Sequence, residues 1–144
     1  MEYNTTQFEK DLEDFQVKLS DIQIKQFIRY YELLVEWNEF MNLTAITEYD
    51  EVMKKHFVDS LSLIKAFDVD KEATVIDVGT GAGFPGLPLK IVCPELKVTL
   101  LDSLDKRIKF LNCVIDELEL QNITAIHGRA EDYASNMEHR EFYD

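Results

Sequence analysis

Residues 75–86 read VIDVGTGAGFPG, and this stretch decides the fold of the 144-residue chain. It holds four of the chain's five glycines, directly after the apolar run VIDV. Such a run is typical of a strand buried on both faces of a parallel sheet. Because glycine is costly to order, a cluster of glycines indicates a backbone geometry that side chains would forbid. The stretch therefore predicts a strand, a glycine-rich turn and a helix N-terminus, which together form a cofactor site.

The sequence after this stretch continues the alternation of strands and helices. Residues 97–102 (KVTLLD) and 122–128 (NITAIHG) predict two more strands, and an amphipathic helix is predicted between them. The order βαβαβ predicts an α/β fold, the first half of a doubly wound Rossmann-like sheet with strand order 3-2-1. The chain stops at EFYD, where a fourth strand is expected to begin. We therefore expect a sheet truncated before strand 4. With the order 3-2-1 this would leave strand 1 as an exposed apolar edge, so we expect either a fragment or another element that covers the edge.

The sequence before this stretch predicts helices. We expect a helical region at residues 1–70, followed by an incomplete cofactor-binding half-domain at residues 71–144. Ser20 and Gln23 have the spacing of a capping box. Thr47 and Asp50 have the same spacing, and a helix is expected to run from there to about Ala66.

Composition narrows the class of protein. The net charge is −13, and residues 1–52 carry 12 acidic and four basic residues, a net charge of −8. Such a surface repels phosphate backbones. The N-terminus lacks the pattern of a signal peptide, and no stretch reaches the roughly 20 apolar residues of a membrane span. Cys93 and Cys113 lack metal-ligand spacing. We expect a cytoplasmic protein without a metal and without a membrane partner.

Two interpretations of the glycine-rich turn compete. The segment GAGFPG (81–86) matches the dinucleotide fingerprint GxGxxG, which predicts NAD. However, Asp77 lies two positions before Gly79, and a carboxylate there would repel a pyrophosphate but attract an ammonium or sulfonium group. That charge favours S-adenosylmethionine. Asp102 ends the second predicted strand, where an acid accepts hydrogen bonds from ribose hydroxyls in either cofactor family. A non-catalytic nucleotide-binding module stays open as a third interpretation.

Five segments carry a family resemblance: NLTAIT (42–47), KKHFVDSLSL (54–63), VIDVGTGAGFPGLPLKI (75–91), LLDSLDKRIKFL (100–111) and GRAED (128–132). They resemble the ribosomal RNA small subunit methyltransferase G family, also called glucose-inhibited division protein B. The resemblance implies a bacterial cytoplasmic enzyme, monomeric at full length, that uses S-adenosylmethionine to form 7-methylguanosine in 16S rRNA of the small ribosomal subunit. The cofactor-binding residues expected from the residues and the resemblance together are Asp77, Gly79, Gly81, Gly83, Phe84, Asp102, Ala130 and Glu131.

The chemistry that the resemblance implies needs few catalytic groups. Nitrogen 7 of guanine has an in-plane lone pair and no proton, so its methylation requires alignment and exclusion of water, but no general base. His56, Asp59 and Ser60 are candidates for the mouth of the site, where they would contact the guanine or a phosphate. The alternative is that His56 and Asp59 pair across one helical turn. Since the family continues after FYD with further strands, we expect the 144-residue chain alone to be nearly inactive.

Overall fold

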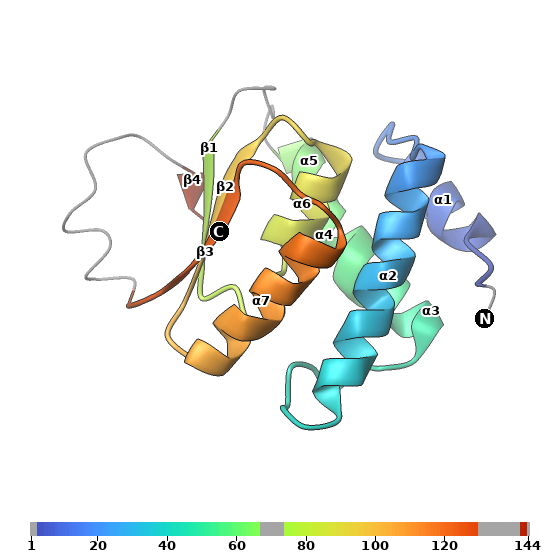
Figure 1. Ribbon diagram of the computed structural model, residues 1–144. Coiled ribbons are helices and arrows are strands. Elements are labelled where there is room, and N and C mark those ends of the chain that lie inside the picture. Colours follow the sequence, from blue (N-terminus) through green and yellow to red (C-terminus); the bar gives the residue numbers. More distant parts are fainter. Residues whose placement is uncertain (1–2, 67–73, 130–141, 144) are drawn as a thin grey trace.

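The computed structural model describes residues 3–66, 74–129 and 142–143 (Figure 1). The N-terminal part is helical, as predicted, and contains α1 (Thr6–Glu13), α2 (Asp21–Asn38), α3 (Tyr49–Glu51), the π-helix η1 (Val52–Val58), α4 (Asp59–Leu61) and α5 (Leu63–Ala66). The remainder alternates strands and helices, in the order β1 (Thr74–Val78), α6 (Gly86–Val92), β2 (Lys97–Asp102), α7 (Asp105–Glu117), β3 (Ile123–His127) and β4 (Phe142–Tyr143). The predicted α/β class is confirmed.

The strands form one parallel sheet in the order β3-β2-β1-β4, which confirms the predicted order of the first three strands. Val78 lies opposite Leu101, and Asp102 lies opposite His127. The carboxyl ends of β1, β2 and β3 therefore meet at one edge of the sheet, which is where ligands of open α/β sheets bind.

Strand 1 is not left as an exposed edge, because another element covers it, as one of the two predicted alternatives stated. Phe142 and Tyr143 form a fourth strand, β4, which pairs in parallel with Val75 and Ile76 of β1. Both β1 residues are at most 1% exposed. A strand this deeply buried needs partners for its backbone amides and carbonyls, and β4 supplies them along these two positions.

All described helices lie on one side of the sheet, with α6 and α7 against the strands and α2 and α1 farther out (Figure 1). One hydrophobic cluster joins them: it includes Phe27 of α2, Phe57 of η1, Leu89 of α6 and Leu111 of α7. Each such buried side chain contributes about 1.5–3 kcal/mol. This packing fixes the N-terminal helices against the helices that follow β1 and β2. The predicted boundary near residue 70 falls at residues 67–73, outside the described residues, and stays a prediction.

The helix ends confirm one predicted cap and correct the other. Ser20 Oγ accepts from the amide of Gln23, and the Gln23 side chain accepts from the amide of Ser20, so the capping box is present. Thr47 does not cap α3, which begins at Tyr49 with Glu48 as its N-cap residue. The single helix expected from there to Ala66 is divided into α3, η1, α4 and α5. The π-helix η1 contains His56. The spacing of apolar residues in the sequence does not predict this change from an α-helix.

Candidate cofactor site

The glycine-rich turn lies at the carboxyl edge of the sheet, between β1 and α6. The amides of Gly79 and Thr80 both donate to the carbonyl of Leu101, the neighbouring residue on β2, at 2.8 and 3.1 Å. Gly79, Gly81 and Gly83 have φ values of +68°, +61° and +99°. Residues with a Cβ rarely adopt these values, so the turn requires glycine at three positions. This confirms the backbone geometry that the glycine cluster predicted.

The four glycines divide into two pairs with different surroundings. A Cβ placed on Gly79 or Gly81 would meet no heavy atom of the described residues within 4 Å, so both face open space. A Cβ on Gly83 would lie 2.3 Å from a methyl carbon of Leu87, and one on Gly86 would lie 2.5 Å from a methyl carbon of Leu100. Gly83 and Gly86 therefore allow the turn to pack closely against the core. Gly79 and Gly81 leave open space on the opposite side of the turn.

Asp77 lies underneath the turn. Its side chain is 2% exposed, and its Oδ2 accepts hydrogen bonds from the hydroxyl of Thr80 at 2.7 Å and from the amide of Gly86 at 2.9 Å. The carboxylate thus ties the start of the turn to the first residue of α6. It also brings a negative charge to the N-terminus of α6, where the pyrophosphate of a dinucleotide would bind. The two negative charges would repel each other, so this geometry disfavours NAD.

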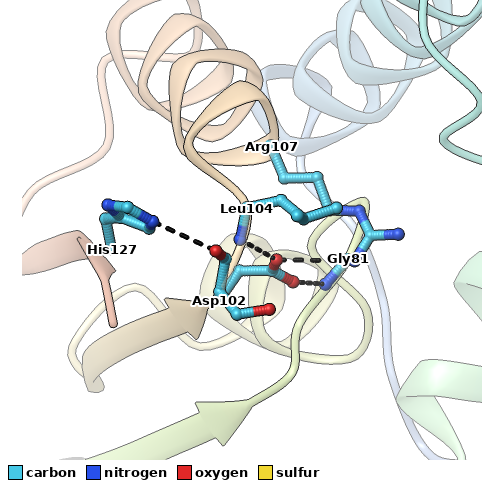
Figure 2. Close-up of polar contacts among 6 residues, drawn as sticks. Gly81, Asp102, Leu104, Arg107 and His127 are labelled. Carbon is cyan, nitrogen blue, oxygen red and sulfur yellow. Dashed lines mark hydrogen bonds and ion pairs between the residues drawn. The ribbon is translucent and has the colours of Figure 1, made fainter. Parts of the chain in front are cut away.

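Asp102 lies at the end of β2, beside the turn (Figure 2). Its Oδ2 accepts from the amide of Gly81 at 2.9 Å, and its Oδ1 accepts from the amide of Leu104 at 3.0 Å. The guanidinium of Arg107 lies 3.4 Å from Oδ1. The buried carboxylate thereby links the glycine turn to the start of α7.

A hollow of about 380 Å³ opens beside Asp102 at the carboxyl edge. It is lined by Val78, Gly79, Leu101, Asp102, Ser103, Gly128 and Arg129. The strand ends and the glycine turn therefore converge on one concavity, which Gly79 and Asp102 both line, and their predicted contact with a cofactor stays a prediction. A larger hollow of about 1030 Å³ lies at the amino-terminal edge of β2, around Lys90 and Lys97, and contains none of the predicted site residues.

His56 lies against the glycine turn, but its hydrogen-bond partner is not the predicted one. Its ring stacks on the ring of Phe84, with centroids 4.4 Å apart and planes 12° from parallel. Within the described part of the chain, the ring bonds to Thr44 Oγ1 through Nε2 at 2.8 Å and makes no hydrogen bond or ion pair with Asp59. The expected pairing of His56 with Asp59 is thus wrong: the η1 helix directs the ring toward Thr44 and Phe84.

Asp59 and Ser60 line a second hollow, of about 500 Å³, beside Phe84 and Pro85. The Asp59 side chain is exposed, whereas Ser60 is buried and its hydroxyl donates to the carbonyl of His56 at 2.5 Å. The three candidates are therefore gathered near the glycine turn, each in a different setting. Their predicted contact with a substrate stays a prediction.

The environment of His56 predicts how stability depends on pH. Burial lowers the pKa of His56 below its ordinary value of 6.5, although the charge of Asp59 opposes the shift. In the unfolded chain the ring therefore binds a proton at a higher pH than in the folded protein. The contribution of the neutral His56 ring to the free energy of unfolding is therefore fully present above about pH 6.5. It is lost as the pH falls below that value. Urea unfolding between pH 7.5 and 5 is expected to show this loss.

The matched control for this pH dependence is His56→Gln, which has no titrating ring. Its free energy of unfolding should depend less on pH across the same interval, since all other titrating groups are unchanged. Equal pH slopes for the two proteins would contradict a depressed His56 pKa.

Three residues important to the geometry were missed by the sequence analysis. Tyr30 of α2 donates its hydroxyl to the carbonyl of Ala82 at 2.5 Å, Thr44 holds His56, and Arg107 pairs with Asp102. Thr44 and Arg107 lie within segments quoted for their family resemblance, but the pairing of Thr44 with His56, 12 residues later, and that of Arg107 with Asp102, five residues earlier, were not predicted. Tyr30 gives no signal beyond helical periodicity. The predicted Ala130 and Glu131, with the neighbouring Asp132, lie outside the described residues.

Two features are absent from the described residues. No group of three or more His, Cys, Asp and Glu side chains there is arranged to hold a metal ion. No helix of that part of the chain combines the length and the apolar composition needed to cross a membrane.

Comparison with known proteins points to one family. The family model GidB, described as rRNA small subunit methyltransferase G, matches residues 23–144. The ribosomal RNA small subunit methyltransferase G of Lachnoclostridium phytofermentans is 57% identical over 144 residues, which are 100% of this chain and 59% of that protein. The protein of the same name from Lysinibacillus sphaericus is 54% identical over 141 residues, 98% of this chain and again 59% of the relative. The chain thus spans about three fifths of the length of these relatives.

A solved structure with a similar fold is a putative protein-L-isoaspartate O-methyltransferase from Plasmodium falciparum in complex with S-adenosyl-L-homocysteine. It matches with a TM-score of 0.50 at 14% sequence identity, over 93% of this chain and 69% of that one. At this identity the likeness shows the fold alone.

Proposed function

Because this chain belongs to the rRNA small subunit methyltransferase G family, we propose that it binds S-adenosylmethionine at the glycine turn and serves methylation of guanine nitrogen 7 in 16S rRNA. The observation that carries the proposal is the open space above Gly79 and Gly81, next to Asp102 at the carboxyl edge of the sheet. A cofactor that must approach the backbone closely needs both this space and the absence of side chains.

The described residues fit such a cofactor. The hollow of about 380 Å³ beside Gly79 and Asp102 has the size of a small-ligand site, and its walls combine strand ends with one buried carboxylate. Each carboxylate oxygen of Asp102 has a second lone pair beyond the bond that it makes to Gly81 or Leu104. The second lone pair of Oδ1 faces the guanidinium of Arg107, so the second lone pair of Oδ2 is the one we assign to a ribose hydroxyl.

The bound cofactor would supply a methyl group on a positively charged sulfur. The chain's own contribution is to hold the reactants in line and to keep water away, since the lone pair of guanine nitrogen 7 carries no proton to remove. Phe84 and Gly79 are residues that we expect to line the cofactor, together with Ala130 and Glu131, which the family resemblance adds. We place the substrate on the side of Phe84 that faces His56, Asp59 and Ser60. The hollow of about 500 Å³ lined by Asp59, Ser60 and Phe84 supports this placement.

The proposal extends to the setting of the reaction. We propose 16S rRNA in the small ribosomal subunit as the partner, the cytoplasm as the location and a monomer as the working state. The strongly acidic surface of residues 1–52 is expected to face away from RNA, because like charges repel.

Isothermal titration calorimetry with S-adenosylhomocysteine and with NAD⁺, each titrated into the 144-residue chain, tests the proposal. We expect heat of binding with S-adenosylhomocysteine and none with NAD⁺. Binding of NAD⁺ alone would overturn the proposal in favour of an oxidoreductase. Binding of neither ligand would favour a non-catalytic module. The outcome with NAD⁺ also tests whether the charge of Asp77 below α6 excludes a pyrophosphate.

A further inference from the structure

Two side chains of the N-terminal helices contact the glycine turn, one at Ala82 and the other at Phe84. The first point is the hydroxyl of Tyr30, which donates to the carbonyl of Ala82 at 2.5 Å. Tyr30 is 0% exposed, and burial together with the charge of Asp77 raises its pKa well above the ordinary value of 10.0. The hydroxyl therefore keeps its proton and acts as a donor at every physiological pH.

The second point is the ring of His56, stacked on Phe84 at 4.4 Å between centroids. Thr44 fixes the plane of the imidazole through Nε2, and the Thr44 hydroxyl itself accepts from the amide of Ile46. Offset aromatic stacking of this kind contributes about 0.5–1.5 kcal/mol beyond the burial of area. Phe84 is thus held between the η1 helix and the Tyr30 ring, whose centroid lies 5.8 Å away.

Both contacts act where the turn has few bonds to the sheet. Gly79 and Thr80 are bonded to Leu101 of β2, but Gly83 and Phe84 donate their amides back to the carbonyl of Thr80 within the turn. The half of the turn from Ala82 to Phe84 consequently depends on local bonds and on contacts from the helices. Removing a helical contact should loosen this half without releasing the half that is tied to the sheet.

We propose that Tyr30 and His56 are positioning residues, which hold the Ala82–Phe84 half of the glycine turn in its binding conformation. The step to cofactor affinity rests on the proposed function, because it assumes that the turn receives S-adenosylmethionine. When the binding conformation is only partly populated, affinity for a ligand falls in proportion. The helical region would thereby set the strength of cofactor binding without touching the cofactor.

Tyr30→Phe tests the first contact, because it removes a single oxygen atom and keeps the aromatic packing. Hydrogen exchange of the Gly83 and Phe84 amides, measured by NMR in the ligand-free protein, is expected to become about tenfold faster, the ratio that corresponds to one buried hydrogen bond. The affinity for S-adenosylhomocysteine should fall about three- to tenfold.

The matched control is Tyr31→Phe, one residue along α2. The Tyr31 hydroxyl also donates to a backbone carbonyl, that of Thr47 at 2.7 Å, away from the glycine turn. This variant should leave both the exchange of the Gly83 amide and the affinity unchanged. If Tyr30→Phe and Tyr31→Phe behave alike, Tyr30 has no positioning role.

His56→Ala and His56→Phe test the second contact. The alanine variant is expected to weaken binding of S-adenosylhomocysteine about three- to tenfold, and the phenylalanine variant, which restores a ring against Phe84, should recover most of that loss. An affinity unaffected by His56→Ala would overturn the positioning role of His56 and leave only its proposed contact with the substrate. If the wild-type chain does not bind S-adenosylhomocysteine, the proposed function fails, while the exchange measurements on Tyr30→Phe still decide the positioning role.

Discussion

Gly83→Ala is expected to lower the free energy of unfolding by about 3 kcal/mol, a large part of the roughly 5–15 kcal/mol that ordinary domains possess. Two costs combine. A φ of +99° is unfavourable for any residue with a Cβ. The new methyl group would also lie 2.3 Å from Leu87 Cδ1 and 2.7 Å from the hydroxyl of Tyr30. Leu87 and Tyr30 are both fully buried, so neither moves aside without disturbing the core.

Urea unfolding followed by circular dichroism measures this loss as a lower midpoint at an unchanged slope. Gly128→Ala is the control, because among the described residues a Cβ there meets a methyl carbon of Leu101 at 3.6 Å, an ordinary contact, and nothing closer. That variant should stay within about 0.5 kcal/mol of the wild type. A Gly83→Ala protein as stable as the Gly128→Ala protein would show that the turn does not pack as described.

Gly81→Val is expected to abolish binding of S-adenosylhomocysteine, with a loss of affinity of at least about 100-fold, the equivalent of about 2.7 kcal/mol. Nothing among the described residues lies within 4 Å of a Cβ at this position, so the valine side chain would occupy the space assigned to the cofactor. The φ of +61° adds a cost in stability of about 2 kcal/mol for a β-branched residue. Calorimetry measures the affinity, and urea unfolding measures the stability.

Gly81→Asn separates these two effects. Asparagine adopts positive φ at low cost, so this variant should keep most of its stability but place a side chain in the same space. We expect it to lose affinity nearly as completely as Gly81→Val. A Gly81→Asn protein that binds S-adenosylhomocysteine like the wild type would place the cofactor elsewhere and remove Gly81 from the site.

Much of the fold follows from patterns between neighbouring residues. The apolar runs at residues 75–78 and 97–102 predicted β1 and β2, and the spacing of Ser20 and Gln23 predicted the start of α2. These signals are local because the strand and helix periods, and the bonds of a cap, join residues close in sequence. A covered β1 was one of two predicted alternatives, but the residues that cover it were not predicted, since the pairing joins residues 67 positions apart.

The candidate site shows the same division. Gly79, Asp77 and Asp102 were located by their positions relative to predicted strand ends. The partner of His56 was predicted incorrectly, because the prediction assumed a regular α-helix with Asp59 one turn away. The η1 helix changes the direction of the ring, and Thr44 from a preceding loop supplies the bond.

The sequence by itself determined that four glycines follow a buried strand, and that a carboxylate ends the next one. Only the tertiary structure decided which glycines face open space and which face the core. A left-handed backbone conformation and a close contact both require glycine, and the one-letter sequence does not distinguish them. The contact that makes the difference at Gly83 comes partly from Tyr30, which belongs to a helix more than 50 residues earlier and reaches the turn only through packing.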